Sequence, residues 1–516
     1  MAAILFASQF RSLFIFPEPN SLRWFGDETW LMSEAKQQIS TGVVRYPLAI
    51  GSQLERGKGL VLGMTWLSAV LYGLPLWIAG HDPIAVGRCV TATLALLLLI
   101  SLYVSSRMLG SSSIASAFVV LLLVSTRSFF FASHSARPDL LAGMIVLLAI
   151  AIGVRYSERT AGLRHSNRWW FVFGAMFLFL VVSSSIHLLT LLAAAAIIFF
   201  WQISTKEHRA SAAIMSAAGM LSMLCVLILA YYLANRSIAL FPASAAQFHD
   251  VVHSIPILRP LSRSVQVANI VTRFKQFASE APIIFLLPIV APFTLKWKNA
   301  RHILAFAAIA VMVSWFLFQG AEINYLIHIL PLLFLCLSIV LARLELRWKS
   351  PAVPLLALAA VTFVFGMRDS STAYKNASRL DTSNNYASRI ISDSIASTWR
   401  STSKPRVLTE PPLLDRLSND TELEVMTDHF ISFPLRVEPI DSFFAREHVN
   451  YAVLYNSPAY PKDRPRNDPF YRSVMQAGQL VTSYIGASGD IGRDYFNPSD
   501  WRDTVLLLKL GGGETR

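Results

Sequence analysis

Long apolar runs dominate the first two thirds of the chain. Runs of about 16–23 residues recur between Ala85 and Val364, and each is close to the length that a helix needs to cross roughly 30 Å of hydrocarbon. Hydrophobic residues make up 54% of the chain and charged residues only 15%, which excludes an ordinary soluble enzyme. The pattern therefore predicts an all-α polytopic membrane domain.

Basic connections between the apolar runs predict how the helices cross the membrane. By the positive-inside rule, four basic connections are cytoplasmic: Arg155–Arg168, Lys206–Arg209, Lys296–His302 and Arg343–Lys349. The first segment, Met1–Phe16, lacks a small-residue cleavage site and is predicted to be a first span or anchor. With it the chain has about eleven transmembrane helices. The others lie near 84–106, 113–131, 139–154, 169–184, 186–201, 211–233, 281–295, 303–319, 325–342 and 351–367.

One apolar segment does not fit this order of crossings. If residues 59–79 crossed the membrane fully, the later basic connections would change sides. Gly63, Gly73 and Pro75 are compatible with a helix that lies at the outer interface instead. The loops 17–83 and 234–280 are then outside. The second loop is long enough to be a lid or substrate loop, and its basic residues could contact an anionic lipid or glycan.

Ionisable residues collect at the outer ends of the predicted spans. No Asp, Glu, Lys or Arg remains near the middle of any span. Charge at the midplane normally marks an ion or proton path, so the pattern argues against a coupled transporter and for chemistry at the outer face. Ordinary interfacial snorkelling is the alternative. The residues concerned are Arg88, Arg127, His134, Arg137, Asp139, His187, Glu322 and His328.

The chain becomes polar after Arg368. Helical periodicity near Tyr386–Trp399 is followed by strand-like runs that alternate with helical stretches. We therefore predict two domains, a membrane domain over residues 1–368 and a soluble, extracytoplasmic α/β domain over residues 369–516. The predicted strands are Arg406–Thr409, Leu423–Thr427, Tyr451–Tyr455, Leu480–Ile485 and Thr504–Leu510.

Charge and cysteine usage exclude several other classes of function. The net charge of +13 comes largely from the short loops between spans, which is unlike a nucleic-acid surface. Cys89, Cys225 and Cys336 all lie inside apolar runs, as small core residues do. The sequence has no Walker A loop and no G-x-G-x-x-G, so nothing indicates direct use of nucleotides.

Two short motifs carry candidate chemistry at the outer face. In the first, Asp27 and Glu28 precede a segment that can form an amphipathic helix, with Asp27 as its N-cap. In the second, Arg137-Pro138-Asp139 opens a span, because proline suits the first turn of a helix. Each motif alone is also typical of a capped surface helix. Their position on one face, two spans apart, makes the combination more specific.

The order of these features resembles the GT-C superfamily of membrane glycosyltransferases. The similarity is greatest to the dolichyl-phosphate-mannose protein mannosyltransferase-like and the lipid A aminoarabinose transferase-like enzymes, and it covers roughly residues 15–370. It rests on the early Asp-Glu, the Gly-rich interfacial helix, Ala-Arg-Pro-Asp-Leu-Leu and the late Asn324-Tyr325, His328 and Pro331. The resemblance implies transfer of a sugar from a polyprenyl-phosphate donor on the periplasmic or luminal side.

The resemblance also implies roles for single residues. Asp27, with Glu28 beside it, corresponds to the acidic residue that acts as catalytic base or orients the substrate. Asp139 corresponds to the second acidic residue, and Arg137 to a basic residue that meets the donor phosphate. Lys58 is a further phosphate contact, although this chain has Arg56-Gly57-Lys58 where many relatives have Pro-Pro-Leu. The substrate-pocket candidates are His134, Glu322, Asn324, Tyr325 and His328.

Metal, partners and alternatives stay open at the level of the sequence. Asp27, Glu28 and Asp139 could together hold a divalent metal such as Mg or Mn, as in some GT-C enzymes, but no spacing rule decides this. We expect a bacterial cytoplasmic (inner) membrane, a polyprenyl-phosphate sugar donor, and an acceptor that is a glycan, lipid or protein. The alternatives are a transporter or flippase of lipid-linked glycans, and a non-catalytic anchor that displays the tail.

The first motif gives a direct prediction. Asp27→Asn should abolish sugar transfer while the protein still inserts normally, because an amide cannot accept the proton of the acceptor. Transfer and insertion are measured in the same membrane preparation. Full activity of the variant would remove Asp27 from the mechanism.

Overall fold

The structure is a computed structural model. The residues that it describes include all the helices and strands named below. The long described stretches are residues 1–15, 66–79, 83–136, 209–235, 263–285, 323–345, 352–409, 451–456, 469–487 and 502–510. Shorter described runs include 139–141, 143–144, 171–172, 174–176, 287–290, 422–427, 444–445 and 448–450.

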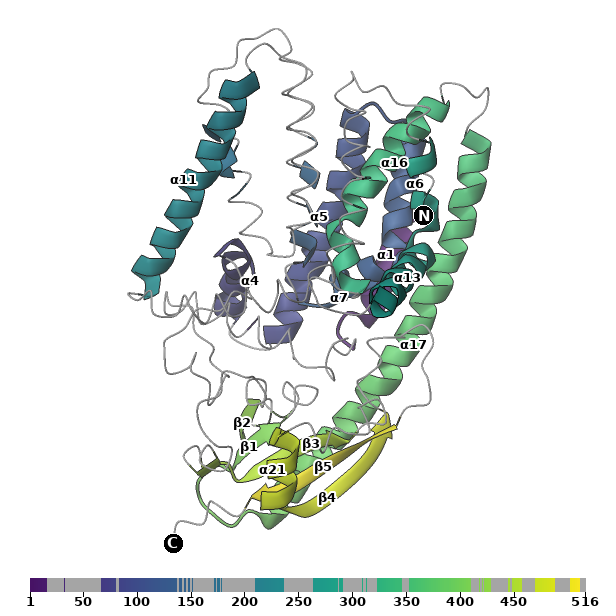
Figure 1. Cartoon of the computed structure of the whole chain (residues 1–516). Helices are drawn as coiled ribbons and strands as arrows, with labels where there is room; N and C mark the ends of the chain where they lie inside the picture. Colours follow the sequence, from purple (N-terminus) through teal and green to yellow (C-terminus); the bar gives the residue numbers. More distant parts are fainter. Residues whose placement is uncertain are drawn as a thin grey trace. The chain divides into compact units, whose positions relative to one another are not determined.

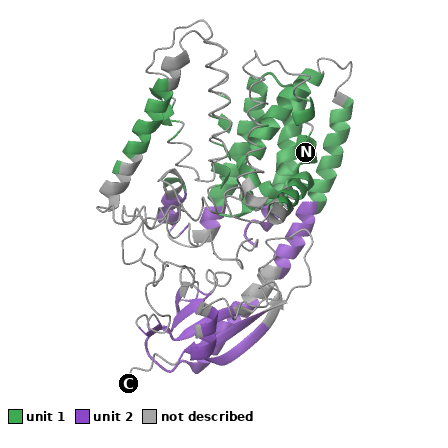
Figure 2. Ribbon diagram, in the orientation of Figure 1, with its two compact units in different colours: residues 1–9, 64–71, 89–368 green, residues 10–63, 72–88, 369–516 purple. Residues whose placement is uncertain are grey.

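The chain divides into two compact units (Figure 2). Unit 1 comprises residues 1–9, 64–71 and 89–368, and unit 2 comprises residues 10–63, 72–88 and 369–516. Figure 1 shows that the labelled elements are helices up to α17 and that the strands follow it. The helices of the first 345 residues are α1 (Ala2–Gln9), η1 (Phe10–Ser12), α4 (Trp66–Ala79), α5 (Pro83–Met108), α6 (Ser113–Val124), α7 (Arg127–His134), α11 (Arg209–Asn235), α13 (Arg263–Glu280), η3 (Pro282–Phe285), η4 (Ile323–His328) and α16 (Leu330–Glu345).

Several of these helices have the character of membrane spans. Within the described residues, Ala85–Met108 of α5 and Val353–Arg379 of the long helix α17 (Ala352–Thr398) are long and apolar enough to cross a bilayer. Shorter apolar helices cover Val70–Ala79, Ile214–Val226 and Leu330–Leu344. The predicted total of about eleven spans remains a prediction, since runs such as 186–201 lie outside the described residues. The same holds for the interfacial placement of α4.

The predicted span over 113–131 is not one straight helix. Two helices occupy this region, and together they are long and apolar enough for one broken span. α6 and α7 meet at a bend of 68°. The side chain of Ser125 donates to the carbonyls of Leu121 and Leu122, 2.9 Å away in each case, and so closes α6. Thr126 then caps α7 by accepting from the amide of Phe129 at 3.2 Å. Two adjacent polar residues thus end one helix and start the next.

α16 forms the centre of the described part of unit 1. It packs against α6, and the residues from Leu332 to Val340 are all buried. A hydrogen bond of 3.0 Å joins Ser338 to Ser111, just before α6. α1 also packs on α6, and its Phe6 meets Phe129 of α7 with ring centroids 6.1 Å apart. An apolar helix surrounded by other helices explains why no charged residue interrupts this run.

α17 corrects a second prediction. The sequence predicted a span ending near 367 and a separate helix near Tyr386–Trp399, but one helix of 47 residues runs through both. No Gly or Pro occurs from Met367 to Thr398, so nothing in the backbone breaks the helix when its composition changes from apolar to polar. The change from apolar to polar residues therefore does not mark the end of the helix.

The tail of unit 2 forms the predicted α/β arrangement. The described strands make one five-stranded sheet in the order β2-β1-β3-β5-β4, in which β1 is parallel to β2 and β3, and β5 is antiparallel to β3 and β4. All five lie within about two residues of the predicted strands. They are β1 (Arg406–Thr409), β2 (Glu424–Thr427), β3 (Tyr451–Asn456), β4 (Gly478–Ala487) and β5 (Arg502–Leu510).

Alternation along β5 places the sheet between two helices. Leu508 and Leu510 face Tyr471 and Val474 of α21 (Pro469–Ala477). Val505 and Leu507 face the other way, toward Ile391 and Ile395 at the end of α17. Because both faces of the strand are covered, the run Val505–Leu508 is apolar without interruption.

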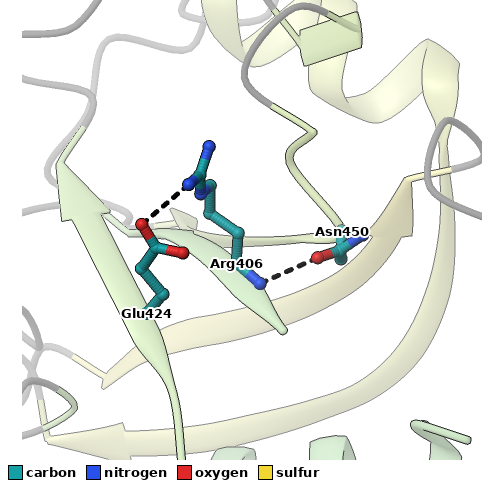
Figure 3. A network of polar contacts seen from close by, with 3 residues as sticks. All are labelled: Arg406, Glu424 and Asn450. Carbon is teal, nitrogen blue, oxygen red and sulfur yellow. Dashed lines mark hydrogen bonds and ion pairs between the residues drawn. The ribbon is translucent and has the colours of Figure 1, made fainter. Parts of the chain in front are cut away.

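Asn450 fastens the start of β1 to the end of β5 (Figure 3). Its side-chain oxygen accepts from the amide of Arg406 at 2.8 Å, and its own amide donates to the carbonyl of Arg406 at 2.9 Å. Its carbonyl accepts from the amide of Leu510 at 2.8 Å. The exposed ion pair between Arg406 and Glu424, at 2.8 Å, adds little by comparison. The asparagine therefore replaces ladder hydrogen bonds where the strands end.

Glu280 closes the first turn of α7. Its Oε2 accepts from the amide of Ser128 at 3.0 Å and lies 3.3 Å from the Ser128 hydroxyl, so an acidic side chain satisfies a free amide at a helix N-terminus. Burial raises the pKa of Glu280 to about 7, and the nearby amide of Ser128 and the charge of Arg127 oppose that rise. Glu280 ends α13, which is not among the candidate spans.

The raised pKa of Glu280 predicts a pH-dependent stability. A carboxyl group whose pKa is higher in the folded state than its ordinary 4.5 stabilises the fold at low pH, and this contribution is lost as the pH rises through about 7. Glu280→Gln keeps an acceptor for Ser128 without the charge. It should match the wild type at pH 5 and raise the thermal midpoint by about 2–4 °C at pH 9.

Glu280→Ala is the control for the hydrogen bond, since it removes the acceptor and should lower the midpoint at both pH values. The measurement is thermal unfolding of the purified protein in detergent. A Glu280→Gln variant that is less stable than the wild type at pH 9 would show that the ionised carboxylate stabilises the fold.

Candidate active site

The candidate site is built at the turn after α7. α7 ends at His134, where Ser135 caps the helix by donating its amide to the carbonyl of Phe131 at 3.1 Å. The chain is helical again at Asp139. This carboxylic acid is only 5% exposed. A carboxylate in such a position needs a hydrogen-bond or charge partner, because its burial alone costs several kcal/mol.

The partner of Asp139 is His328, the last residue of η4. Nε2 of His328 lies 2.9 Å from Oδ1 of Asp139, and the two side chains are 2% and 7% exposed. The residues are 189 positions apart in the sequence. A short hydrogen bond to a carboxylate in a buried place is among the stronger polar contacts in proteins, and it holds both side chains in one orientation.

A glycine allows the two segments to come close enough for this contact. Gly143 is one helical turn after Asp139, and a Cβ atom placed on it would lie 3.0 Å from the carbonyl oxygen of Ile327 and 3.6 Å from Cγ of Pro331. A larger residue would require the carbonyl of Ile327 to move by a few tenths of an ångström. Gly143 thus fits the approach that the Asp139–His328 hydrogen bond requires.

His134 is engaged with the protein on both sides of its ring. Nδ1 lies 2.8 Å from the carbonyl of Phe130 and 3.0 Å from the Ser133 hydroxyl, and Nε2 lies 2.9 Å from the carbonyl of Gln9. The ring also stacks on Phe130 with centroids 4.0 Å apart. These contacts favour a structural link between α1 and α7. A role for His134 in the substrate pocket stays a prediction.

The other predicted site residues divide into two groups. Asn324 and Tyr325 lie in η4, the same short helix as His328, and the structure describes their backbone. Five predicted residues lie outside the described residues: Asp27, Glu28, Lys58, Arg137 and Glu322. Of the residues predicted for the site, the structure thus joins Asp139 and His328 directly.

The metal prediction is not decided by the described part of the chain. Among the described residues, no group of three or more His, Cys, Asp and Glu side chains is arranged to hold a metal ion. Two of the three predicted ligands, Asp27 and Glu28, lie outside that part. The proposed metal site therefore remains a prediction.

Sequence reasoning missed two features of this region. Both Asp139 and His328 were candidates, but nothing in their spacing indicated that they form a pair. Glu280 was not singled out at all. The sequence does carry a signal for Glu280. It ends a helix whose other charged residues are all basic, and it stands directly before the apolar segment Ala281–Phe285. A carboxylate next to an apolar segment is less often solvated than one within a polar loop.

Comparison with known proteins gives a clear result at the level of structure. No protein-family model matches the sequence, and no curated protein has a similar sequence. Among solved structures, ArnT from Cupriavidus metallidurans bound to undecaprenyl phosphate is similar with a TM-score of 0.56 and 13% identity, over 98% of this chain and 96% of that one.

Two further structures show the same similarity. The apo form of ArnT has a TM-score of 0.56 and 14% identity over the same shares of the two chains. An apo oligosaccharyltransferase from Archaeoglobus fulgidus has a TM-score of 0.53 and 11% identity, over 97% of this chain and 75% of that one. Identity at this level shows the fold alone. The chain shares the fold of ArnT and of this oligosaccharyltransferase, in line with the membrane-glycosyltransferase fold that the order of its motifs predicted.

Proposed function

We propose that this chain is a membrane glycosyltransferase that moves a sugar from a polyprenyl-phosphate-linked donor to an acceptor on the extracytoplasmic side. The observation that carries the proposal is the buried Asp139–His328 pair at the turn where the sequence predicted an acidic site residue. The fold supports it, because the similar ArnT structure contains undecaprenyl phosphate. An apolar carrier also suits a protein with exposed apolar helix surfaces such as those of α5 and α17.

The reaction requires a small set of groups. An acceptor hydroxyl or amine attacks the anomeric carbon, the bond from that carbon to the phosphate oxygen breaks, and the polyprenyl phosphate leaves with the electron pair. The acceptor loses one proton, which a carboxylate takes up. We assign this proton to Asp27, with Glu28 beside it. Arg137 and Lys58 neutralise the charge that gathers on the departing phosphate.

Asp139 supplies a fixed negative charge to the site. The anomeric carbon becomes positive as the bond to the leaving group breaks, and a carboxylate that is already oriented stabilises that charge without reorganisation. His328 provides the orientation through its hydrogen bond to Oδ1 at 2.9 Å. Asn324 and Tyr325, on the same short helix as His328, are the proposed contacts of the acceptor.

A divalent metal fits the donor set only in part. Carboxylate oxygens are the ligands that Mg²⁺ and Mn²⁺ prefer, and Asp27, Glu28 and Asp139 would supply them. Oδ1 of Asp139 already lies 2.9 Å from Nε2 of His328, however, so a metal would compete with the histidine for this oxygen. A bound metal would add positive charge next to the donor phosphate.

The cellular setting follows from the same reasoning. We place the protein in a bacterial cytoplasmic membrane with residues 369–516 outside, where they would contact or cap an acceptor glycan, lipid or protein. Nothing in the described part of the chain favours the alternative of a transporter or flippase. That alternative requires polar residues through the membrane centre, whereas α16 is apolar along its buried length.

Asp139→Asn tests the proposal directly. The amide keeps the size of the side chain but removes its negative charge, so transfer should fall by about 10²–10⁴-fold. The assay uses purified protein in lipid nanodiscs with radiolabelled polyprenyl-phosphate sugars and counts the transferred product. Asp393→Asn, on the exposed polar part of α17, is the matched control and should keep full activity.

Three outcomes are informative. Product from the wild type and the Asp393 variant but not from the Asp139 variant supports the proposal. Equal product from the Asp139 variant would exclude Asp139 from the mechanism. Movement of the intact lipid-linked sugar across the bilayer, with no transferred product, would favour the flippase alternative.

A further inference from the structure

α13 exposes a row of apolar side chains although it is a polar helix. Val267, Ile270, Val271 and Phe274 are between 41% and 58% exposed. Their spacing of three, four and seven positions places them on one side of the helix. Phe274 also contacts the ring of Phe285, with centroids 4.6 Å apart, and is still 51% exposed. Exposed apolar side chains along one side of a helix usually mark a binding surface or contact with a membrane.

The exposure is not the result of a loosely attached helix. The last turn of α13 is fixed in unit 1: Phe277 is fully buried and meets Phe285 edge to face with ring centroids 5.3 Å apart. Glu280 binds the amide of Ser128 at 3.0 Å. The first four turns therefore extend from a well-anchored end, with the apolar row turned outward.

α13 does not cross a membrane. Among the described residues it is absent from the candidate spans, and it carries Arg263, Arg273 and Lys275 among many polar residues. Its single acidic residue, Glu280, is turned inward at α7. The helix thus combines an exposed apolar row with a net positive charge. That combination is typical of helices that lie in the plane of a membrane interface.

We propose that α13 is such an interfacial helix, with its apolar row among the acyl chains and its basic residues at the headgroups of anionic phospholipids. Charge complementarity supports this occupant, because basic residues attract phosphatidylglycerol-like headgroups. The sequence supports it as well: α13 leads straight into the apolar segment 281–295, which places its end at the boundary of the hydrocarbon. Binding of a soluble protein partner would not require α13 to lead into an apolar segment.

The position of α13 links the membrane surface to the candidate site. Its end caps α7, and the turn after α7 leads to Asp139, the partner of His328. α13 also contacts η4, the helix that carries His328. The inference concerns where the helix lies and does not depend on the proposed sugar transfer.

Spin labels at single cysteines test the proposal. The three native cysteines are replaced by serine, and labels are placed at Val267 and Phe274 on the apolar row. Matched labels at Asn269 and Gln276 lie about 200° away by helical periodicity. The full-length protein is reconstituted in nanodiscs that contain phosphatidylglycerol. Collision with oxygen, which concentrates in lipid, is compared with collision with a water-soluble nickel chelate.

We expect the ratio of oxygen to nickel accessibility to be several-fold higher at 267 and 274 than at 269 and 276. Replacing phosphatidylglycerol by phosphatidylcholine should lower the ratio at 267, because the attraction of the basic residues is lost. Equal nickel accessibility at all four positions would place the row in water. Protection from both reagents at 267 and 274 would show that protein covers it. Either result, or no effect of lipid charge, would overturn the proposal.

Discussion

The hydrogen bond between Asp139 and His328 is the contact on which the candidate site depends. It joins the turn after α7 to η4 across 189 positions of sequence, in a place where both side chains are nearly excluded from solvent. Loss of this hydrogen bond would cost roughly 1.5–3 kcal/mol, as is typical of a hydrogen bond to a charged group. Gly143 makes the approach sterically feasible.

Much of the fold could be predicted because it follows from local patterns. α5 and the five strands follow from the length of apolar runs and from alternation, and their bounds differ from the predictions by only a few residues. The bend between α6 and α7 could not be predicted in this way. It depends on whether Ser125 and Thr126 cap helices or stay in one, and only the surrounding packing decides that. The unbroken α17 shows the opposite case, in which a change of composition suggested a break that the backbone does not require.

The candidate site was predictable as a set of residues but not as a geometry. Arg137-Pro138-Asp139 and His328 were found by motif order and sidedness, whereas their direct pairing is a tertiary contact that no spacing rule encodes. Glu280 was missed because a carboxylate at the end of a polar helix is common, and its role becomes visible only when Ser128 is seen to donate to it. Together these contacts hold α7 and η4 around one buried carboxylate, and through Glu280 they connect this centre to α13.

A double-mutant cycle tests whether Asp139 and His328 act as one unit. Asp139→Asn, His328→Leu and the double variant are compared by thermal unfolding and by transfer activity, with His328→Gln as the control that keeps a hydrogen-bond donor. The structure predicts that the double variant loses less than the sum of the single losses, with a coupling of about 1–3 kcal/mol, and that His328→Gln retains most of it. Strictly additive losses would show that the two side chains do not interact, and would contradict this account of the site.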